Sequence, residues 1–299
     1  MAKAKKKPIY FSEDESEKAV ISRMDKKQVD PRLYEVMTSL VKHMHAFIKD
    51  VEPTFEEWMA GIQFLTKTGH MCTDWRQEFI LLSDTLGVSM LVETINNRKP
   101  SGATETTVLG PFYVTDAPKR ENGANISLDG KGEPMVVTGR VTDTKGKPIK
   151  GATLDVWQAN EDGFYDVQQK GIQPDMNLRG IFTTDADGRY WFRSAKPRFY
   201  PIPDDGTVGK MLKALGRHSY RPAHLHFILG AKGYQPITTH YFVPGDPYLE
   251  SDAVFGVKES LIVDFTLNKD KKTMKQHGFT RPFWEAECNF VLAKRKETS

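Results

Sequence analysis

Two histidines in the second half of the chain, His224 and His226, stand two residues apart in the apolar run Arg221-Pro-Ala-His-Leu-His-Phe-Ile-Leu. This run predicts a β-strand, in which residues two apart project from the same face, so both imidazoles could bind one ion. His43 and His45 have the same spacing in a helical pattern, where they would lie about 200° apart around the axis. We therefore expect a shared ion only at the first pair. The alternative is one core histidine beside one that only forms a hydrogen bond.

Two tyrosines could bind the same ion. Tyr165 comes just after a predicted strand, and Tyr200 lies in the proline-rich segment Tyr200-Pro-Ile-Pro, which we expect to lack regular structure. A neutral phenol, with a pKa of about 10, is a poor ligand, but a trivalent cation favours its anion. Zinc usually takes Cys, His and carboxylate, and non-heme Fe(II) commonly takes two His and one carboxylate. Two Tyr with two His therefore favour Fe(III), and the alternative for each tyrosine alone is a buried ring with a satisfied hydroxyl.

The order of these four residues, in the motifs Gly163-Phe-Tyr-Asp, Tyr200-Pro-Ile-Pro and Arg221-Pro-Ala-His-Leu-His, resembles the intradiol ring-cleaving dioxygenases. The similarity runs from about residue 25 to about residue 295. Tyr165-Asp-Val-Gln and Ser251-Asp-Ala-Val-Phe-Gly-Val-Lys resemble the branch of the family that acts on hydroxyquinol. The resemblance implies a non-heme Fe(III) enzyme that uses O2 to open a small aromatic diol or triol between its two hydroxyl-bearing carbons.

The resemblance also implies roles for single residues. The Fe(III) ligands would be Tyr165, Tyr200, His224 and His226, with Tyr200 leaving the metal when substrate arrives. Arg221 would stabilise negative charge on the substrate ring. Without the resemblance, the alternative is a surface arginine at the start of a strand. With hydroxyquinol the product would be 3-hydroxy-cis,cis-muconate, the enol form of maleylacetate. Catechol or a chlorinated catechol is the alternative substrate.

Substrate contacts are expected by alignment with the family's pocket. They are Leu81, Asp84, Val108, Leu109, Gly110, Pro111, Phe112, Ile202, Pro203, Arg221, His240 and Val254. Asp84, on an apolar helix, could accept a hydrogen bond from a third ring hydroxyl, whereas catechol offers nothing there to compensate its burial. Asp84 could equally face solvent. His240 stands where catechol-cleaving members tend to carry glutamine, and it could contact the substrate or a metal ligand.

Composition narrows the class of protein. The 299 residues include 42 basic and 39 acidic side chains, a near balance that argues against a nucleic-acid-binding surface. We find neither a signal peptide nor an apolar stretch of the roughly 20 residues that a membrane span needs. Cys72 and Cys288 lack metal-type spacing, so we expect free, buried thiols in a cytoplasmic protein. The basic run Lys3–Lys7 and the acidic residues after it predict a flexible tail over 1–24.

A helical region is expected over 25–103. An apolar stripe at spacings of three and four runs through Tyr34, Met37, Val41, Met44 and Ile48. Thr54 and Glu57 predict a capping box that opens a second helix with Phe55, Trp58, Met59 and Ile62 facing inward, and a third helix is expected from about Asp74 past Leu91. These stripes could pack on the β domain, on each other or across a two-fold axis. The family resemblance implies the last, a homodimer with phospholipid sometimes held between its helices.

The spacing of apolar residues changes after residue 103. Residues 104–133, rich in Gly, Pro and Thr, are expected to be a linker that contributes to the pocket. Residues 134–299 then alternate at a period of two and predict a β-sandwich catalytic domain, with a hairpin turn at Asp185-Ala-Asp-Gly188 and a last strand at Leu261-Ile-Val-Asp-Phe. The expected fold is thus mostly β with an N-terminal helical domain. Two rivals stay open: a metal-free sandwich that only binds, and a zinc hydrolase, which the two tyrosines disfavour.

Overall fold

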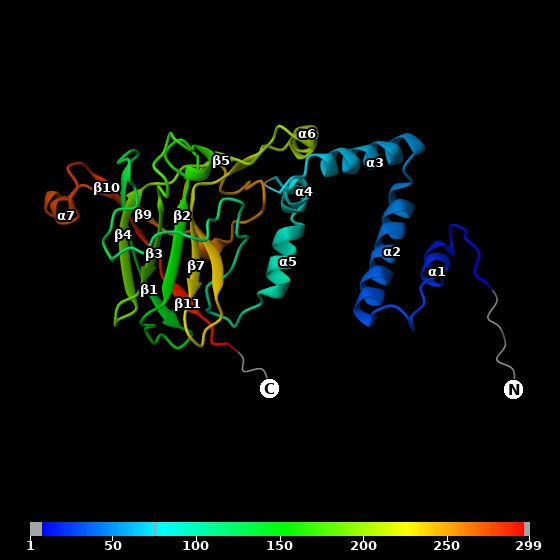
Figure 1. The fold of residues 1–299 in the computed structure, drawn as a ribbon, viewed down its shortest axis with the longest axis horizontal. Helices are drawn as coiled ribbons and strands as arrows, with labels where there is room; N and C mark the ends of the chain where they lie inside the picture. Colours follow the sequence, from blue (N-terminus) through cyan, green and yellow to red (C-terminus); the bar gives the residue numbers. More distant parts are fainter. Residues whose placement is uncertain (1–7, 75, 296–299) are drawn as a thin grey trace. The chain divides into compact units, whose positions relative to one another are not determined.

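The computed structural model describes residues 8–74 and 76–295, which divide into two compact units between residues 67 and 68. The basic run Lys3–Lys7 lies outside the described residues. The first unit contains α1 (Ser16–Ile21), α2 (Pro31–Val51) and most of α3 (Phe55–His70) (Figure 1). Helix α1 contacts α2 and buries Ala19, so the segment predicted to be a flexible tail carries a short helix.

Local sequence explains where α2 and α3 begin. The Asp30 side chain accepts a hydrogen bond from the Leu33 amide, with Pro31 in the first turn of α2. The predicted capping box of α3 is confirmed, since the Thr54 amide donates to Glu57 over 2.8 Å and the Glu57 amide donates to the Thr54 hydroxyl over 3.2 Å. Both helices follow the apolar periodicity of their sequences.

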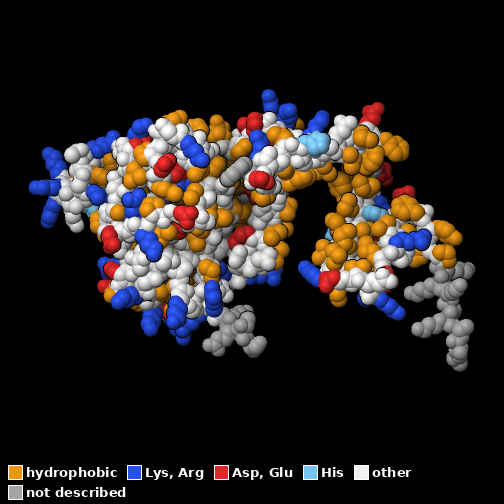
Figure 2. Space-filling model, viewed as in Figure 1, with side chains coloured by type: hydrophobic (Ala, Val, Ile, Leu, Met, Phe, Trp, Pro, Cys, Tyr) orange, Lys and Arg blue, Asp and Glu red, His pale blue; other side chains and the backbone are white. Residues whose placement is uncertain are grey.

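The apolar faces of α2 and α3 are exposed. None of the residues of α2, all of which the structure describes, is buried. Hydrophobic side chains cover much of the surface of both helices (Figure 2). They include Leu33, Val36, Met37, Leu40, Met44, Phe47, Ile48, Val51, Phe55, Trp58, Met59, Ile62 and Leu65. The expectation that Phe55 and its neighbours pack inward is therefore wrong for a single chain, since Phe55 is 90% exposed.

The third predicted helix is two helices. Helix α4 (Glu78–Thr85) ends before Gly87, and α5 (Val88–Asn96) begins after it. The φ of Gly87 is +73°, in the left-handed region where a glycine breaks a helix at little cost. The second unit also contains α6 (Thr207–Ala214), α7 (Lys271–Gln276) and the 3-10 turns η1 (Asp166–Gln168) and η2 (Glu259–Leu261).

Two sheets form the predicted sandwich (Figure 1). One sheet is built around β1 (Pro134–Asp143), which pairs with β4 (Arg189–Ala195), β10 (Phe283–Glu287) and β11 (Phe290–Leu292), while β9 (Phe265–Asn268) pairs with β10. The other has the order β3 (Arg179–Thr183), β2 (Thr153–Gln158), β7 (His224–Gly230), β8 (Ile237–Phe242). A single buried core joins side chains of both sheets, among them Val137 and Phe192 from one and Leu154 and Phe227 from the other.

Several local expectations need correction. The last predicted strand begins at Phe265, because Leu261 closes the turn η2, and β10 and β11 were not predicted. The Tyr200 segment is not irregular, since β5 (Tyr200–Pro201) pairs with β6 (Tyr220–Arg221).

The turn at Gly188, the two thiols and the helices were each described in advance by the sequence. The hairpin turn at Gly188 is confirmed, with a φ of +73° and a 3.1 Å hydrogen bond from its amide to the Asp185 carbonyl. Both thiols are free, but only Cys288 is buried, while Cys72 is half-buried. Among the described residues, no helix has the length and apolarity to cross a membrane.

Candidate metal centre and substrate pocket

Three predicted ligand atoms converge at one end of β7. The Nε2 atoms of His224 and His226 are 3.0 Å apart, and the Tyr165 hydroxyl lies 2.7 Å from His226 Nε2. All three side chains are about 1% exposed. Strand alternation places both imidazoles on one face, as predicted, and the tyrosine reaches them from a loop 61 residues away in sequence.

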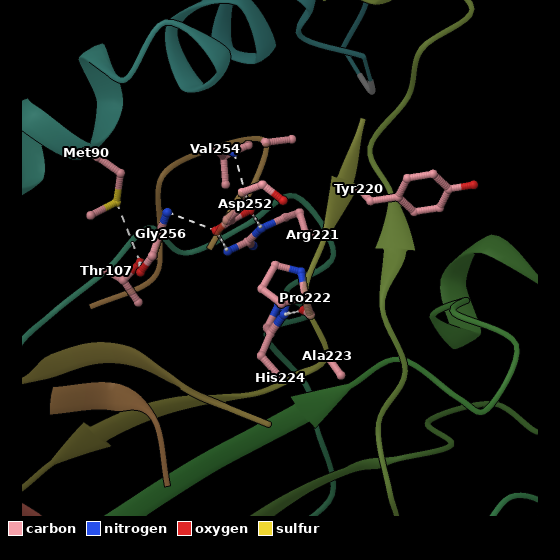
Figure 3. Close-up of polar contacts among 12 residues, drawn as sticks. Met90, Thr107, Tyr220, Arg221, Pro222, Ala223, His224, Asp252, Val254 and Gly256 are labelled. Carbon is pink, nitrogen blue, oxygen red and sulfur yellow. Dashed lines mark hydrogen bonds and ion pairs between the residues drawn. The ribbon is translucent and has the colours of Figure 1, made fainter. Parts of the chain in front are cut away.

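The imidazoles are held with lone pairs available. His224 Nδ1 lies 2.7 Å from the Pro222 carbonyl, which can only accept, so Nδ1 donates and Nε2 keeps its lone pair (Figure 3). Burial, reinforced by the charge of Arg221, lowers the pKa of His224 to about 3. Burial lowers the pKa of His226 well below its usual value, and the neighbouring His240 and His224 lower it further. Both rings are thus neutral at pH 7, the state that binds metal.

The loop that carries Tyr165 is tied down beside it. The Asp166 carboxylate accepts hydrogen bonds from Arg179 Nε at 2.7 Å and from the Met176 amide at 3.1 Å. It also forms a buried ion pair with Arg179, whose Nη2 lies 2.6 Å from Asp166 Oδ1. Phe112 stacks on the Tyr165 ring at a centroid distance of 4.6 Å. Burial, and then the neighbouring Tyr200, raises the pKa of Tyr165 well above 10. Its phenolate therefore forms at neutral pH only beside a strong positive charge.

Tyr200 completes the group. Its ring centroid lies 5.3 Å from that of Tyr165 and 5.6 Å from that of His224, and the side chain is 3% exposed. Pairing of Tyr200 with Arg221 across β5 and β6 places it there. Gly163 allows the two tyrosine loops to approach, since its φ is +83° and a Cβ on it would lie 2.7 Å from the Phe199 carbonyl oxygen and 3.1 Å from Tyr200 Cβ.

Gly163→Ala is expected to separate the two loops. The variant should lower the free energy of unfolding by about 1–3 kcal/mol through left-handed strain plus a backbone clash, and it should weaken binding of a metal ion. Gly146→Ala is the matched control, because Gly146 also has a positive φ, +78°, but has nothing within 4 Å of the added Cβ. Thermal unfolding and metal content check both, and equal losses in the two variants would contradict the role of close approach.

A third imidazole faces the same point. Nitrogen atoms of His224, His226 and His240 all lie within 4.8 Å of one another, and His240 is fully buried. Neither ring nitrogen of His240 has a hydrogen-bond partner among the described residues, and Nδ1 of His226 also lacks one. Orphaned buried nitrogens are costly unless a bound group satisfies them. These nitrogen atoms and the nearby phenols fit a metal ion. His240 lies beside both predicted ligand histidines, which is one of the two positions that the sequence left open for it.

The structure gathers part of the predicted substrate pocket. Leu81, Ile202 and Val254 meet in one apolar cluster with Leu212 and Ala253. Phe112 lies between Tyr165 and Tyr200, and a Cβ on Gly110 would lie 3.2 Å from His226 Cε1. Burial and the neighbouring His224 lower the pKa of His240 well below its usual value, and the Val108 backbone, which acts in the opposite direction, lies beside this ring. Leu109, Pro111 and Pro203 are exposed, and no described contact joins them to the ligand group.

Charged residues border this group. Arg221 is 3% exposed and pairs with Asp252, its Nε and Nη2 lying 3.1 and 3.2 Å from the two carboxylate oxygens (Figure 3). A surface position for Arg221 is therefore wrong. Asp84 is half-buried rather than facing solvent; burial raises the pKa of its carboxyl, while Ser89 and Arg221 act in the opposite direction.

Two residues of this region were missed. Asp252 lies in Ser251-Asp-Ala-Val-Phe-Gly, a motif that resembles the hydroxyquinol branch of the family but does not by itself indicate a role for Asp252. Trp157 stacks on His226 at a centroid distance of 4.5 Å and an angle of 14°, and it is the register partner of His226 between β2 and β7. Alternation in β2 places Trp157 on the face of Thr153 and Asp155, opposite the core residues Leu154 and Val156, so the local pattern does not indicate a buried ring. Its partner on β7 depends on strand register.

Two family models together match most of the chain. A family model described as "Dioxygenase" matches residues 108–293, and one described as "Catechol dioxygenase N terminus" matches residues 30–104. Hydroxyquinol 1,2-dioxygenase of Rhizobium sp. (strain MTP-10005) is 60% identical over 95% of this chain and 97% of its own length.

Solved structures of similar fold cover almost the whole chain. Hydroxyquinol 1,2-dioxygenase from Pseudomonas putida DLL-E4 has a TM-score of 0.87 at 46% identity and covers 95% of this chain and 97% of its own. Catechol 1,2-dioxygenase from Acinetobacter radioresistens has a TM-score of 0.82 at 30% identity, covering 96% and 95%. The chain belongs to the intradiol ring-cleavage dioxygenase family, and it is an enzyme of that type.

Proposed function

We propose that this enzyme cleaves hydroxyquinol between its two adjacent hydroxyl-bearing carbons with O2 to give 3-hydroxy-cis,cis-muconate, the enol form of maleylacetate. Its metal would be Fe(III), held by Tyr165, Tyr200, His224 and His226. The observation that carries this proposal is the convergence of buried phenol and imidazole groups, with Tyr165 Oη 2.7 Å from His226 Nε2. Phenolates suit a hard trivalent ion, and three histidines alone would suit zinc equally well.

Each residue has a task in this reaction. Bound Fe(III) would supply Lewis acidity that favours the substrate diolate and prepares the ring for O2. The Tyr200 phenolate would take one of the two diol protons and become a neutral phenol, and a hydroxide ion would take the other and leave as water, while Tyr165, His224 and His226 keep their places. The Arg221 guanidinium would stabilise negative charge that develops on the ring in a site from which water is excluded.

The direct experiment reconstitutes the full-length protein with iron and follows its colour, O2 uptake and product. We expect a red to burgundy protein, from tyrosinate bound to Fe(III), that consumes one O2 for each hydroxyquinol and forms the ring-opened dicarboxylate. A colourless protein that holds no iron after reconstitution would instead support a metal-free binding module.

Hydroxyquinol rather than catechol is proposed because the relatives at 60% and 46% identity carry that name and because the half-buried Asp84 lies within electrostatic range of Arg221. Asp84 can accept a hydrogen bond from the third ring hydroxyl, and catechol would offer it no such donor.

Asp84→Ala should therefore reduce kcat/KM for hydroxyquinol about tenfold to hundredfold and change that for catechol less than about threefold. Ile80→Ala, at a 56% exposed position on the same helix, serves as the control and should leave the ratio unchanged. Steady-state kinetics with hydroxyquinol, catechol and a chlorocatechol measure the ratio. An unaltered preference in Asp84→Ala would remove this role from Asp84.

A homodimer through the N-terminal helices is part of the proposal, supported by the exposed apolar face of α2 and α3. Leu40→Glu should raise the dimer dissociation constant at least about 100-fold, because an unpaired carboxylate would be buried. Lys42→Glu, on the polar side of α2, should leave it nearly unchanged. Sedimentation velocity measures the masses, and mass spectrometry of an organic extract shows whether phospholipid accompanies the dimer. A Leu40→Glu variant that stays dimeric would place the interface elsewhere.

We also propose a cytoplasmic location. The support is that both cysteines are free, which suits a reducing compartment.

A further inference from the structure

We infer that Asp252 is a positioning residue of the active site: it orients the Arg221 guanidinium for catalysis and, in the same contact, secures the loop that carries Val254. This inference rests on the proposed function, because it assigns Asp252 a role through Arg221. The two side chains are 2% and 3% exposed, and the carboxylate approaches one edge of the guanidinium at 3.1 and 3.2 Å (Figure 3). A planar fork against a carboxylate fixes direction as well as distance.

The ion pair with Asp252 determines which N–H groups of Arg221 are left for other partners. A guanidinium has five N–H bonds, of which Asp252 takes the one on Nε and one on Nη2. Both bonds on Nη1 and the second on Nη2 are left for other partners. Arg221 also influences the pKa values of Tyr165, His224 and Asp84, so it lies within electrostatic range of the metal ligands and the pocket carboxylate.

Asp252 is itself held by its own loop. Its Oδ2 accepts from the Gly256 amide at 2.9 Å, and its Oδ1 accepts from the Val254 amide at 3.3 Å. The turn puts Phe255 at a φ of +58°, a conformation that costs free energy for a residue with a side chain. The loop therefore wraps around the carboxylate, and it presents Val254 to the apolar cluster that contains Leu81 and Ile202.

Glycine at position 256 allows the loop backbone to lie against the ion pair. A Cβ there would lie 2.7 Å from Arg221 Nη2, 3.1 Å from Asp252 Oδ2 and 3.3 Å from Thr107 Oγ1. The Thr107 hydroxyl donates to the Gly256 carbonyl over 3.3 Å. The guanidinium is thus confined on one side by the carboxylate and on another by backbone, so a larger residue at 256 would displace it.

The charges of the pair support each other. Burial opposes the charged form of Arg221, but Asp252, Tyr200 and Tyr165 together outweigh it, and the pKa of Arg221 is raised. Burial likewise opposes the charged form of Asp252, and Arg221 lowers the pKa of that carboxyl below its usual value. The site therefore keeps a fixed positive charge next to the tyrosines at neutral pH.

The test uses Asp252→Asn in the iron-loaded, full-length enzyme. We expect kcat with hydroxyquinol to fall about tenfold to hundredfold, a size typical of a lost supporting contact, with a smaller change in KM. Asp246→Asn is the matched control. The Asp246 carboxylate accepts from the amides of Ala223 and Tyr248 at 3.1 and 2.9 Å but pairs with no arginine among the described residues, so kcat should stay within about threefold.

A double-variant cycle separates positioning from general stability. If Asp252 acts through Arg221, Arg221→Gln combined with Asp252→Asn should be no more than about threefold slower than Arg221→Gln alone. Losses that multiply, or an Asp252→Asn kcat within threefold of wild type, would overturn the inference. If wild-type enzyme with bound iron opened no diol at all, the proposed function would fail instead.

A second variant covers the case in which Asp252→Asn does not fold. Gly256→Ala keeps both charged residues but pushes on Arg221 Nη2, so we expect kcat to drop about tenfold while iron content and the visible absorption remain. An unaltered kcat in a folded Gly256→Ala enzyme would overturn the inference.

Discussion

Replacement of His226 by alanine should give a colourless enzyme with kcat reduced by roughly three orders of magnitude or more. His226 Nε2 lies within 3.0 Å of both Tyr165 Oη and His224 Nε2, so its ring occupies the centre of the ligand group. Its loss would remove one of two proposed imidazole ligands and leave a cavity against Trp157, which stacks on it. Iron analysis, the visible spectrum and O2 uptake measure the effect.

His45→Ala provides the control for that experiment. His45 belongs to the other His-X-His pair, on α2, where the two rings project from different sides of the helix. The variant should keep wild-type colour and turnover. A His226→Ala enzyme that retained stoichiometric iron and more than a tenth of its activity would show that the ligand set is wrong.

Replacement of Arg221 by glutamine should lower kcat about a hundredfold to a thousandfold while iron remains bound. It should also lower the free energy of unfolding at neutral pH by about 3–5 kcal/mol, because the buried Asp252 carboxylate would lose its counterion. In the variant the pKa of Asp252 would rise above its unfolded value. A group with a raised folded-state pKa stabilises below the unfolded pKa and loses that contribution as pH rises. The stability deficit should therefore be smaller at pH 5 than at pH 8.

Arg217→Gln is the matched comparison for Arg221→Gln. Arg217 donates to the carbonyls of Thr85 and Ala253 at 2.6 and 3.0 Å, so it is a structural arginine of the same region without a carboxylate partner in these bonds. Its loss should reduce stability slightly and leave kcat within a few fold. Denaturant unfolding at both pH values and steady-state kinetics separate the two arginines. Equal kcat values for the two variants would remove Arg221 from catalysis.

Strand and helix identities came from periodicity wherever one face of an element is buried or apolar. The alternation around His224 and His226 predicts β7, and the spacing of apolar residues predicts α2 and α3. Periodicity failed where a short element depends on a distant partner. The pairing of Tyr200 with Arg221 has no local signal, since two residues cannot establish an alternation, and the break at Gly87 interrupts an apolar pattern that itself continues.

The sequence alone determined the kinds of donor atom available and the face on which the paired histidines project, because both follow from residue type and local backbone geometry. Only the tertiary structure decided that Tyr165 reaches His226, that His240 joins the two ligand histidines and that Asp252 meets Arg221. These contacts join strands and loops that are distant along the chain. Their register and approach are set by packing in the sandwich core and by a few close backbone contacts such as that at Gly163, and no periodic pattern in the sequence records them.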